Sequence, residues 1–264
     1  MRKLAPTAYL AAGALAVCLL SVTIAQAGIS APTAQAGISA TSAEATVTAT
    51  LAPSLAPDRL GAQGALTLTI GYVGGEGGVP SPVRRATLRF PVGLGIEIPH
   101  LRSCSPARLR ARGPSGCPPQ SLLGHGSALA EAQAGSQTIT EHISLSLFLG
   151  PFHNLEPTLE ILGQGYTPFD ERVVLIGTVL PDNPPYGEDL ILSVPAIPTL
   201  PLEPDASIVR MSLTVGARKP RDPRNANTVV VPARCPRGGF PFAADFAYAD
   251  GSSGAALSTA PCPR

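Results

Sequence analysis

The sequence predicts an all-β protein: an antiparallel β-sandwich, immunoglobulin-like or jelly-roll-like, with roughly ten or eleven strands and one short helix. Apolar residues alternate with small polar residues along many segments, which is the period of a strand with one face on a core. Helical periodicity is almost absent. The chain also contains 27 glycines and 29 prolines, and proline is kept out of central strands and collects at edges and turns.

The first 27 residues have the organisation of a cleaved export signal. Arg2 and Lys3 precede an apolar run from Leu10 to Leu20, and residues 25–27 (Ala-Gln-Ala) supply a small-residue cleavage site. The apolar run is shorter than the ~20 residues that span a bilayer. We therefore expect cleavage after Ala27, no membrane span after cleavage, and a secreted or cell-surface protein.

Two alternatives stay open for this region. Cys18 would carry the lipid of a lipoprotein, although Val17 stands where such sites need a small side chain. Residues 25–30 (Ala-Gln-Ala-Gly-Ile-Ser) recur at 34–39, so the mature chain starts at Gly28 or, after a second cleavage site, at Gly37. Residues 28–43 are predicted to be a flexible lead because they hold little to bury.

Residues 44–264 are predicted to form a single β-sandwich domain. The clearest alternation runs through residues 66–72, 143–149, 209–215 and 242–248. Weaker strand candidates are residues 46–51, 86–90, 121–131, 158–162, 189–194, 228–231 and 255–259. The nearly continuous apolar run at 173–180 predicts a central strand that is covered on both faces. The proline-rich stretch 181–205 is interpreted as a long edge connection, since the 59 residues after it are too few to bury a core alone.

The four cysteines of the mature chain predict two disulfides, as is typical of an exported protein. Three pairings are possible. We favour Cys104 with Cys117 and Cys235 with Cys262, because each pair is close in sequence and brackets one structural unit. Between the first two, Ser105-Pro106 begins a short arginine-rich helix and Gly-Pro at 113–114 ends it. Zinc is the alternative for these cysteines, but no CxxC or Cys–His ligand spacing occurs, so no metal site is predicted.

Positive and negative charges nearly balance in the mature chain. The whole chain has 19 basic and 18 acidic residues, and removal of Arg2 and Lys3 leaves 17 basic ones. This balance gives no electrostatic reason to expect nucleic-acid binding. Basic clusters lie at residues 102–112 and 218–224, and either solvated loops or contact with an anionic cell-envelope polymer would explain them.

No constellation in the sequence predicts a catalytic site or a cofactor. The Gly-x-Ser-x-Gly elbow of α/β-hydrolases, phosphate loops and dinucleotide fingerprints are absent. Glu160, Asp170 and Glu171 are the candidate carboxylates for a secreted hydrolase of polysaccharides or esters, but nothing in the sequence pairs them. The lack of tryptophan weakens carbohydrate recognition, because sugar-binding surfaces use aromatic rings.

Histidines and oxygen-bearing residues give further candidates for ligand sites. The four histidines are predicted to be turn, edge or exposed residues: His100, His125, His142 and His153. A cluster in the proline-rich stretch has the oxygen atoms that calcium prefers, without the spacing of an EF-hand loop: Asp182, Asn183, Glu188 and Asp189. A solvated acidic turn is the simpler interpretation of that cluster.

The stretch from Cys104 to Gly124 contains Gly-Cys-Pro-Pro-Gln-Ser-Leu-Leu-Gly at 116–124 and is followed by a small-residue strand from Ser127. It resembles a pattern that recurs in uncharacterised secreted β-rich proteins of GC-rich bacteria. The resemblance implies export and β structure. It carries over no activity and no functional residue.

We expect an exported, non-catalytic protein that acts as an extracellular or cell-surface interaction or structural module, with a cell-envelope polymer or a protein as its partner. A secreted hydrolase acting on polysaccharide or ester is the first alternative. A carrier of an apolar ligand is the second, since 44% of the residues are hydrophobic and a sandwich can open between its layers.

Overall fold

The computed structural model describes residues 47–56, 59–74, 78–98, 101–166, 171–199, 203–216 and 229–263. The predicted export signal and flexible lead, the basic cluster at 218–224, His100 and Asp170 lie outside these residues. Within them the chain is mostly β structure, as predicted, with one short α-helix and two short 3-10 helices. In the part of the chain that is described, no helix has the length and apolar character needed to cross a membrane.

Thirteen strands occur in the described residues, more than the ten or eleven predicted. They are β1 (Thr48–Ala56), β2 (Gln63–Val73), β3 (Val83–Pro91), β4 (Gly95–Ile96), β5 (Leu122–Ala134), β6 (Gln137–Leu149), β7 (Thr158–Gln164), β8 (Arg172–Pro181), β9 (Tyr186–Ser193), β10 (Ser207–Val215), β11 (Val229–Val230), β12 (Phe240–Tyr248) and β13 (Ser253–Ala260). Twelve of them coincide with segments whose alternation or apolar run predicts a strand, and only the two-residue β4 has no such signal.

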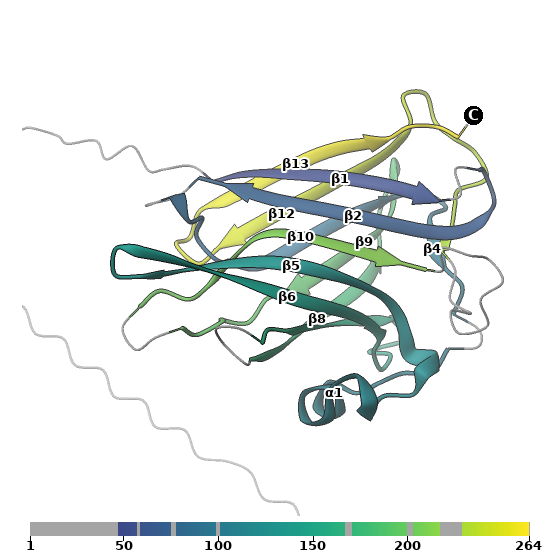
Figure 1. Cartoon of the computed structure of the whole chain (residues 1–264). Helices are drawn as coiled ribbons and strands as arrows, with labels where there is room; N and C mark the ends of the chain where they lie inside the picture. Colours follow the sequence, from purple (N-terminus) through teal and green to yellow (C-terminus); the bar gives the residue numbers. More distant parts are fainter. Residues whose placement is uncertain are drawn as a thin grey trace, which may run out of the picture. The chain divides into compact units, whose positions relative to one another are not determined.

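The strands do not form the predicted sandwich of two sheets. They form one antiparallel sheet in the order β13-β12-β3-β9-β8-β7-β6-β5-β10-β2-β11-β4, and β1 also pairs with β2. The sheet curls until β1 lies beside β13, with no pairing between these two strands among the described ladders (Figure 1). Register shifts in four of the ladders accompany this curl. Alternation shows only that each strand has one buried face, which a curled sheet and a sandwich share.

Both disulfides lie at one end of the curled sheet, called here the disulfide end. Cys104 pairs with Cys117 and Cys235 with Cys262, at Cα–Cα distances of 5.3 and 5.7 Å, and these are the two pairs that the sequence favours. The opposite end, called the hairpin end, carries the tight turns from β5 to β6 and from β12 to β13. Gly135 in the first of these turns has a φ of 59°, which glycine adopts without strain.

Helix α1 (Pro106–Arg112) forms where the sequence predicts it. The Ser105 hydroxyl accepts a hydrogen bond from the backbone N–H of Arg108 at 3.4 Å, and Gly113 ends the helix. Leu109 is completely buried and anchors α1 on the outer face of the sheet. The outer cluster under α1 consists of Cys104, Leu109, Cys117, Phe148, Leu162 and Val174. Strand β8 is therefore covered on both faces, as its apolar run predicts.

The prediction for residues 181–205 was wrong in part. They do not form one edge connection, because β9 lies inside this stretch and occupies a central place between β8 and β3. The inward residues Leu190 and Leu192 are buried in the core. The short β11, which precedes Cys235 in the chain, pairs with β2 and β4.

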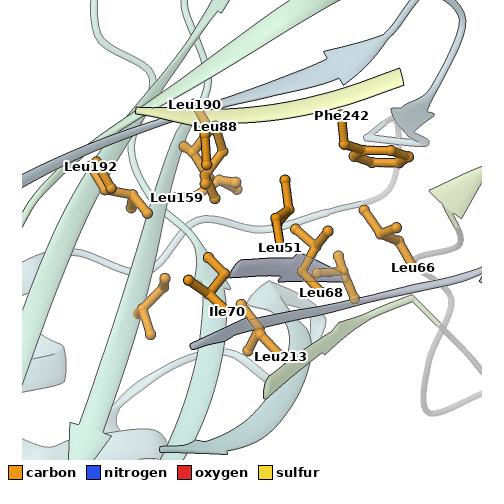
Figure 2. Close-up of a cluster of buried hydrophobic side chains, with 14 of the residues drawn as sticks. Leu51, Leu66, Leu68, Ile70, Leu88, Leu159, Leu190, Leu192, Leu213 and Phe242 are labelled. Atoms are coloured by element: carbon orange, nitrogen blue, oxygen red, sulfur yellow. The ribbon is translucent and has the colours of Figure 1, made fainter. Parts of the chain in front are cut away.

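The main core fills the inside of the curl. Alternate residues of each strand point inward, among them Leu66, Leu68 and Ile70 of β2 and Leu190 and Leu192 of β9 (Figure 2). Burial of such side chains, at roughly 25 cal/mol per Å² of apolar surface, is the main favourable contribution to folding. The inward pattern also decides what kind of site the interior forms.

Candidate ligand-binding interior

Three adjoining cavities lie inside the curled sheet. Their volumes are about 90, 40 and 40 Å³. Ile161 of β7 and Met211 of β10 line all three, so the cavities meet around these two side chains. The largest extends toward the disulfide end past Leu66 and Val215, and the other two lie toward the hairpin end.

The cavity walls are almost entirely aliphatic. Leucine, isoleucine and valine side chains of nine strands line the largest cavity, and small residues on the inner face leave space unfilled. Ala128 and Gly163 border the third cavity, and Gly95 borders the first. A cavity with such walls offers water almost nothing to bond and therefore favours an apolar occupant.

The connection from β9 to β10 passes over the hairpin end of the interior. Pro195 and Ile197 line the second cavity, and the backbone N–H of Ala206 donates to the Ile197 carbonyl at 2.9 Å. An ion pair between Arg84 and Asp205 ties the connection to β3. The described part of this connection therefore covers the second cavity at the hairpin end.

Carboxylates mark both ends of the row of cavities. Glu188 of β9 lines the largest cavity while remaining exposed to solvent, so that cavity reaches the surface near Glu188. Partial burial of the Glu188 carboxylate raises its pKa. Glu141 and Glu171 line the third cavity, and burial together with the charge of Glu171 raises the pKa of Glu141.

Sequence reasoning named Glu188 as a calcium candidate and Glu171 as a hydrolase candidate, but it did not name Glu141 or predict an interior site. A signal for Glu188 and Glu141 was available. Glu188 lies two residues before Leu190 and four before Leu192, so it shares their face of β9. Glu141 shares a face of β6 with Ile143 and Leu145 in the same way. A charged residue at a core-facing position of an alternating strand indicates a rim or a pocket. The role of Met211 depends on which strands face one another, which alternation does not specify.

The structure does not bring the candidate hydrolase residues together. Glu160 points to the outer face of β7, toward the outer cluster, whereas Glu171 lines the third cavity on the inner side. Asp170 lies outside the described residues. Glycoside hydrolysis needs two carboxylates across one cleft, and the described carboxylates of this proposed centre face opposite sides of the sheet.

Glu160 is nevertheless unusual. It is completely buried, and neither carboxylate oxygen has a hydrogen-bond partner among the described residues. Burial raises its pKa to about 7, and the nearby positive charge of Arg110 opposes that shift. Glu160 is paired across the sheet with Phe148 and Ile176 in a region without a cavity. Its effect is expected on stability, not on turnover.

The candidate calcium residues form an ion-pair cluster around Arg89. The Arg89 guanidinium lies 2.6 Å from Asp245, 3.8 Å from Asp189 and 3.9 Å from Asp182. The Arg89 side chain therefore occupies the position that a cation would take. Asn183 donates its backbone N–H to the Asp182 carboxylate, and Glu188 faces the interior instead.

The remaining candidates are dispersed. Among the described histidines, His125 and His142 are exposed on strands and His153 lies in the turn between β6 and β7. No group of three histidine, cysteine or acidic side chains in the described part of the chain is arranged to hold a metal ion. The arginines of α1 are exposed.

Among the described residues, the interior thus combines volume, largely apolar walls and an opening to the surface. Comparison of the chain with protein-family models, curated proteins and solved structures finds no match. The function is therefore inferred from the side chains of the site themselves.

Proposed function

We propose that this chain is an exported, non-catalytic protein that binds a slender apolar ligand inside its curled sheet. The observation that carries the proposal is the row of three aliphatic cavities that meet at Ile161 and Met211. The two disulfides and the predicted export signal support a role outside the cell.

The cavity volumes limit the shape of the ligand. An apolar cavity of about 150 Å³ is enough to bind benzene in a protein interior. The largest cavity here is smaller, at about 90 Å³. A ligand must therefore extend from it past Met211 into a second cavity, which favours an alkyl or acyl chain over a compact ring system.

The carboxylates limit the polar end of the ligand. An alkyl chain that enters from the disulfide end leaves its head group near the carboxylate of Glu188, which lines the largest cavity and reaches solvent. A second carboxylate there would be repelled. A hydroxyl or another hydrogen-bond donor would be accepted, so the ligand class is a neutral chain with a donor head group.

The sequence ranked an interaction module above a carrier, and the cavities reverse that order. A carrier needs an apolar space that reaches the surface, which the largest cavity supplies. The hydrolase alternative receives no support from Glu160 and Glu171, which face opposite sides of the sheet.

The test is a calorimetric titration of the mature, disulfide-bonded protein with 1-decanol and with decanoate. Decanol should bind with one saturable site and decanoate at least about tenfold more weakly, since repulsion of one charge pair costs about 1.4 kcal/mol or more at short range. Glu188→Gln should reduce the difference in affinity between decanol and decanoate.

Val179→Phe fills the largest cavity and should abolish decanol binding. The matched control Val73→Phe adds the same ring at an exposed position and should leave decanol binding unchanged. Equal binding by the two phenylalanine variants would refute an interior site.

A further inference from the structure

The turn between β6 and β7 places a leucine in a backbone conformation that favours glycine. His153 and Glu156 form an isolated antiparallel bridge around Asn154 and Leu155, which have φ values of 50° and 71°. Two-residue hairpin turns of this kind prefer Asn followed by Gly, because both central residues need positive φ. Leu155 is a bulky residue at the glycine position, and such a residue is strained there.

Leu155 gains no packing that would offset this strain. Its side chain is 93% exposed, and Phe152 in the same turn is 52% exposed. Substitution by glycine would relieve the backbone and lose no buried contact in the isolated protein. The turn therefore presents two apolar side chains to solvent at a cost in stability, and this is the pattern of a contact site.

A group of arginines lies beside the base of this turn. The Cys104 N–H, just before α1, donates to the Leu149 carbonyl at 2.8 Å, which fixes the start of the α1 segment against the strand that leads into the turn. The exposed arginines of this segment form no ion pair among the described residues: Arg102, Arg108, Arg110 and Arg112. Arg172 lies farther from this turn, because it begins β8 and pairs with Gln164 at the far end of β7, and its guanidinium donates to the Arg110 carbonyl at 3.1 Å. Glu156, which is half-buried, is the acid of the turn.

Other exposed apolar side chains project from the same end of the sheet. Leu60 lies between β1 and β2 and Val92 between β3 and β4, with exposed fractions of 39% and 52%. The disulfide end thus combines apolar loop tips, unpaired arginines and the surface opening of the largest cavity. The hairpin end carries no comparable set of arginines in its described turns.

We propose that the disulfide end docks on an anionic lipid surface, with Leu155 and Phe152 inserted among the acyl chains and the α1 arginines on the headgroup phosphates. Interfacial binding combines buried apolar area with attraction of basic residues to anionic lipid. Guanidinium groups also bind phosphate in a bidentate manner. This proposal goes beyond ligand binding and does not depend on it.

The test is flotation of the mature, disulfide-bonded protein with vesicles of phosphatidylcholine alone and of phosphatidylcholine with 30% phosphatidylglycerol, a fraction of roughly the size at which anionic lipids dominate surface potential. Binding is expected only to the anionic vesicles and should weaken at high salt.

Leu155→Gly should lower vesicle affinity about tenfold and raise the melting temperature by about 2 °C. Leu257→Gly is the matched control, because Leu257 is 80% exposed on β13, away from the turn, and should leave vesicle binding unchanged.

A second variant separates the contribution of charge. Arg108→Gln together with Arg112→Gln should lower affinity for anionic vesicles by at least about tenfold, at about 1 kcal/mol for each arginine, with an unchanged melting temperature. Equal binding to both vesicle types, no vesicle binding, or a Leu155→Gly variant that is less stable and binds normally would each overturn the proposal. Decanol binding in those variants should persist, which keeps a failure of docking distinct from a failure of the carrier function.

Discussion

On the β12 side of the interior, aromatic rings fill the space, whereas on the side formed by β7, β9 and β10 aliphatic side chains leave cavities. Strand β12 contributes Phe240, Phe242, Phe246 and Tyr248, all buried, and none of them lines any of the three cavities. The Phe246 ring packs edge-on against Tyr72, with centroids 5.0 Å apart.

The difference shows how one alternating pattern produces two kinds of interior. Large rings fill the distance between facing parts of the curled sheet and add edge-to-face contacts. Leucine, valine and glycine at the same kind of position fill less volume and leave an enclosed apolar space. The aromatic side is therefore suited to hold the sheet together, and the aliphatic side to accept a ligand.

The largest expected effect comes from truncation on the aromatic side. Phe242→Ala should lower the free energy of unfolding by about 4 kcal/mol, whereas Met211→Ala should lower it by about 2 kcal/mol, because Met211 already borders unfilled space. Urea unfolding of both variants measures the contrast. Equal losses would mean that the two sides are packed alike.

A second prediction distinguishes the outer cluster under α1 from the interior by the pH dependence of stability. The pKa of Glu160 is raised from its ordinary value of 4.5 to about 7, so the folded protein holds a proton that the unfolded chain releases between these pH values. Stability should therefore fall by about 3 kcal/mol as pH rises from 4.5 to 7, at about 1.4 kcal/mol for each pKa unit. Glu160→Gln should remove this part of the pH dependence, and Glu156→Gln, at a half-buried carboxylate in the turn between β6 and β7, should not.

Urea unfolding of wild type and both variants at pH 4.5 and pH 8 provides the measurement. Saturating decanol should raise stability at both pH values by the same amount, because Glu160 faces away from the cavities. An identical pH profile in wild type and Glu160→Gln would show that Glu160 is not held in its neutral form.

The smallest expected difference in stability is between two variants that enlarge a buried alanine, one on the aromatic side and one beside a cavity. Ala244 on β12 is fully buried away from the cavities, and Ala128 borders the third cavity. Ala244→Val should cost about 1 to 3 kcal/mol through overpacking, whereas Ala128→Val should change stability by less than about 0.5 kcal/mol. Thermal unfolding distinguishes the two, and a reversed order would contradict the assignment of the unfilled volume.

The strands could be predicted from sequence because their signal is local. Alternation at 66–72 and at 242–248 is visible without any partner strand, and so are the cap at Ser105 and the end of α1 at Gly113. The pairing order is not local. A strand with one buried face fits a sandwich or a curled sheet equally well, so the closure of β1 toward β13 and the central place of β9 had no signal in the pattern.

The candidate site was less predictable than the fold. A cavity arises from the sum of side-chain volumes across strands that are distant in sequence, as with Ile161 and Met211. Glu160 and Glu171 are close in sequence, but the two-residue period of a strand and the turn between β7 and β8 place them on opposite sides of the sheet. Proximity in sequence therefore indicated a carboxylate pair that the fold separates.

The most direct test of a ligand-binding interior uses the methyl group of Met211. The chain contains two methionines, Met1 and Met211, so a mature chain that starts at Gly28 gives a single methionine signal in a ¹³C-methyl spectrum. We predict that 1-decanol shifts this signal saturably, with the same midpoint as calorimetry, and that Val179→Phe abolishes the shift. A signal that stays fixed while decanol saturates the protein would place the ligand elsewhere and contradict the proposed function.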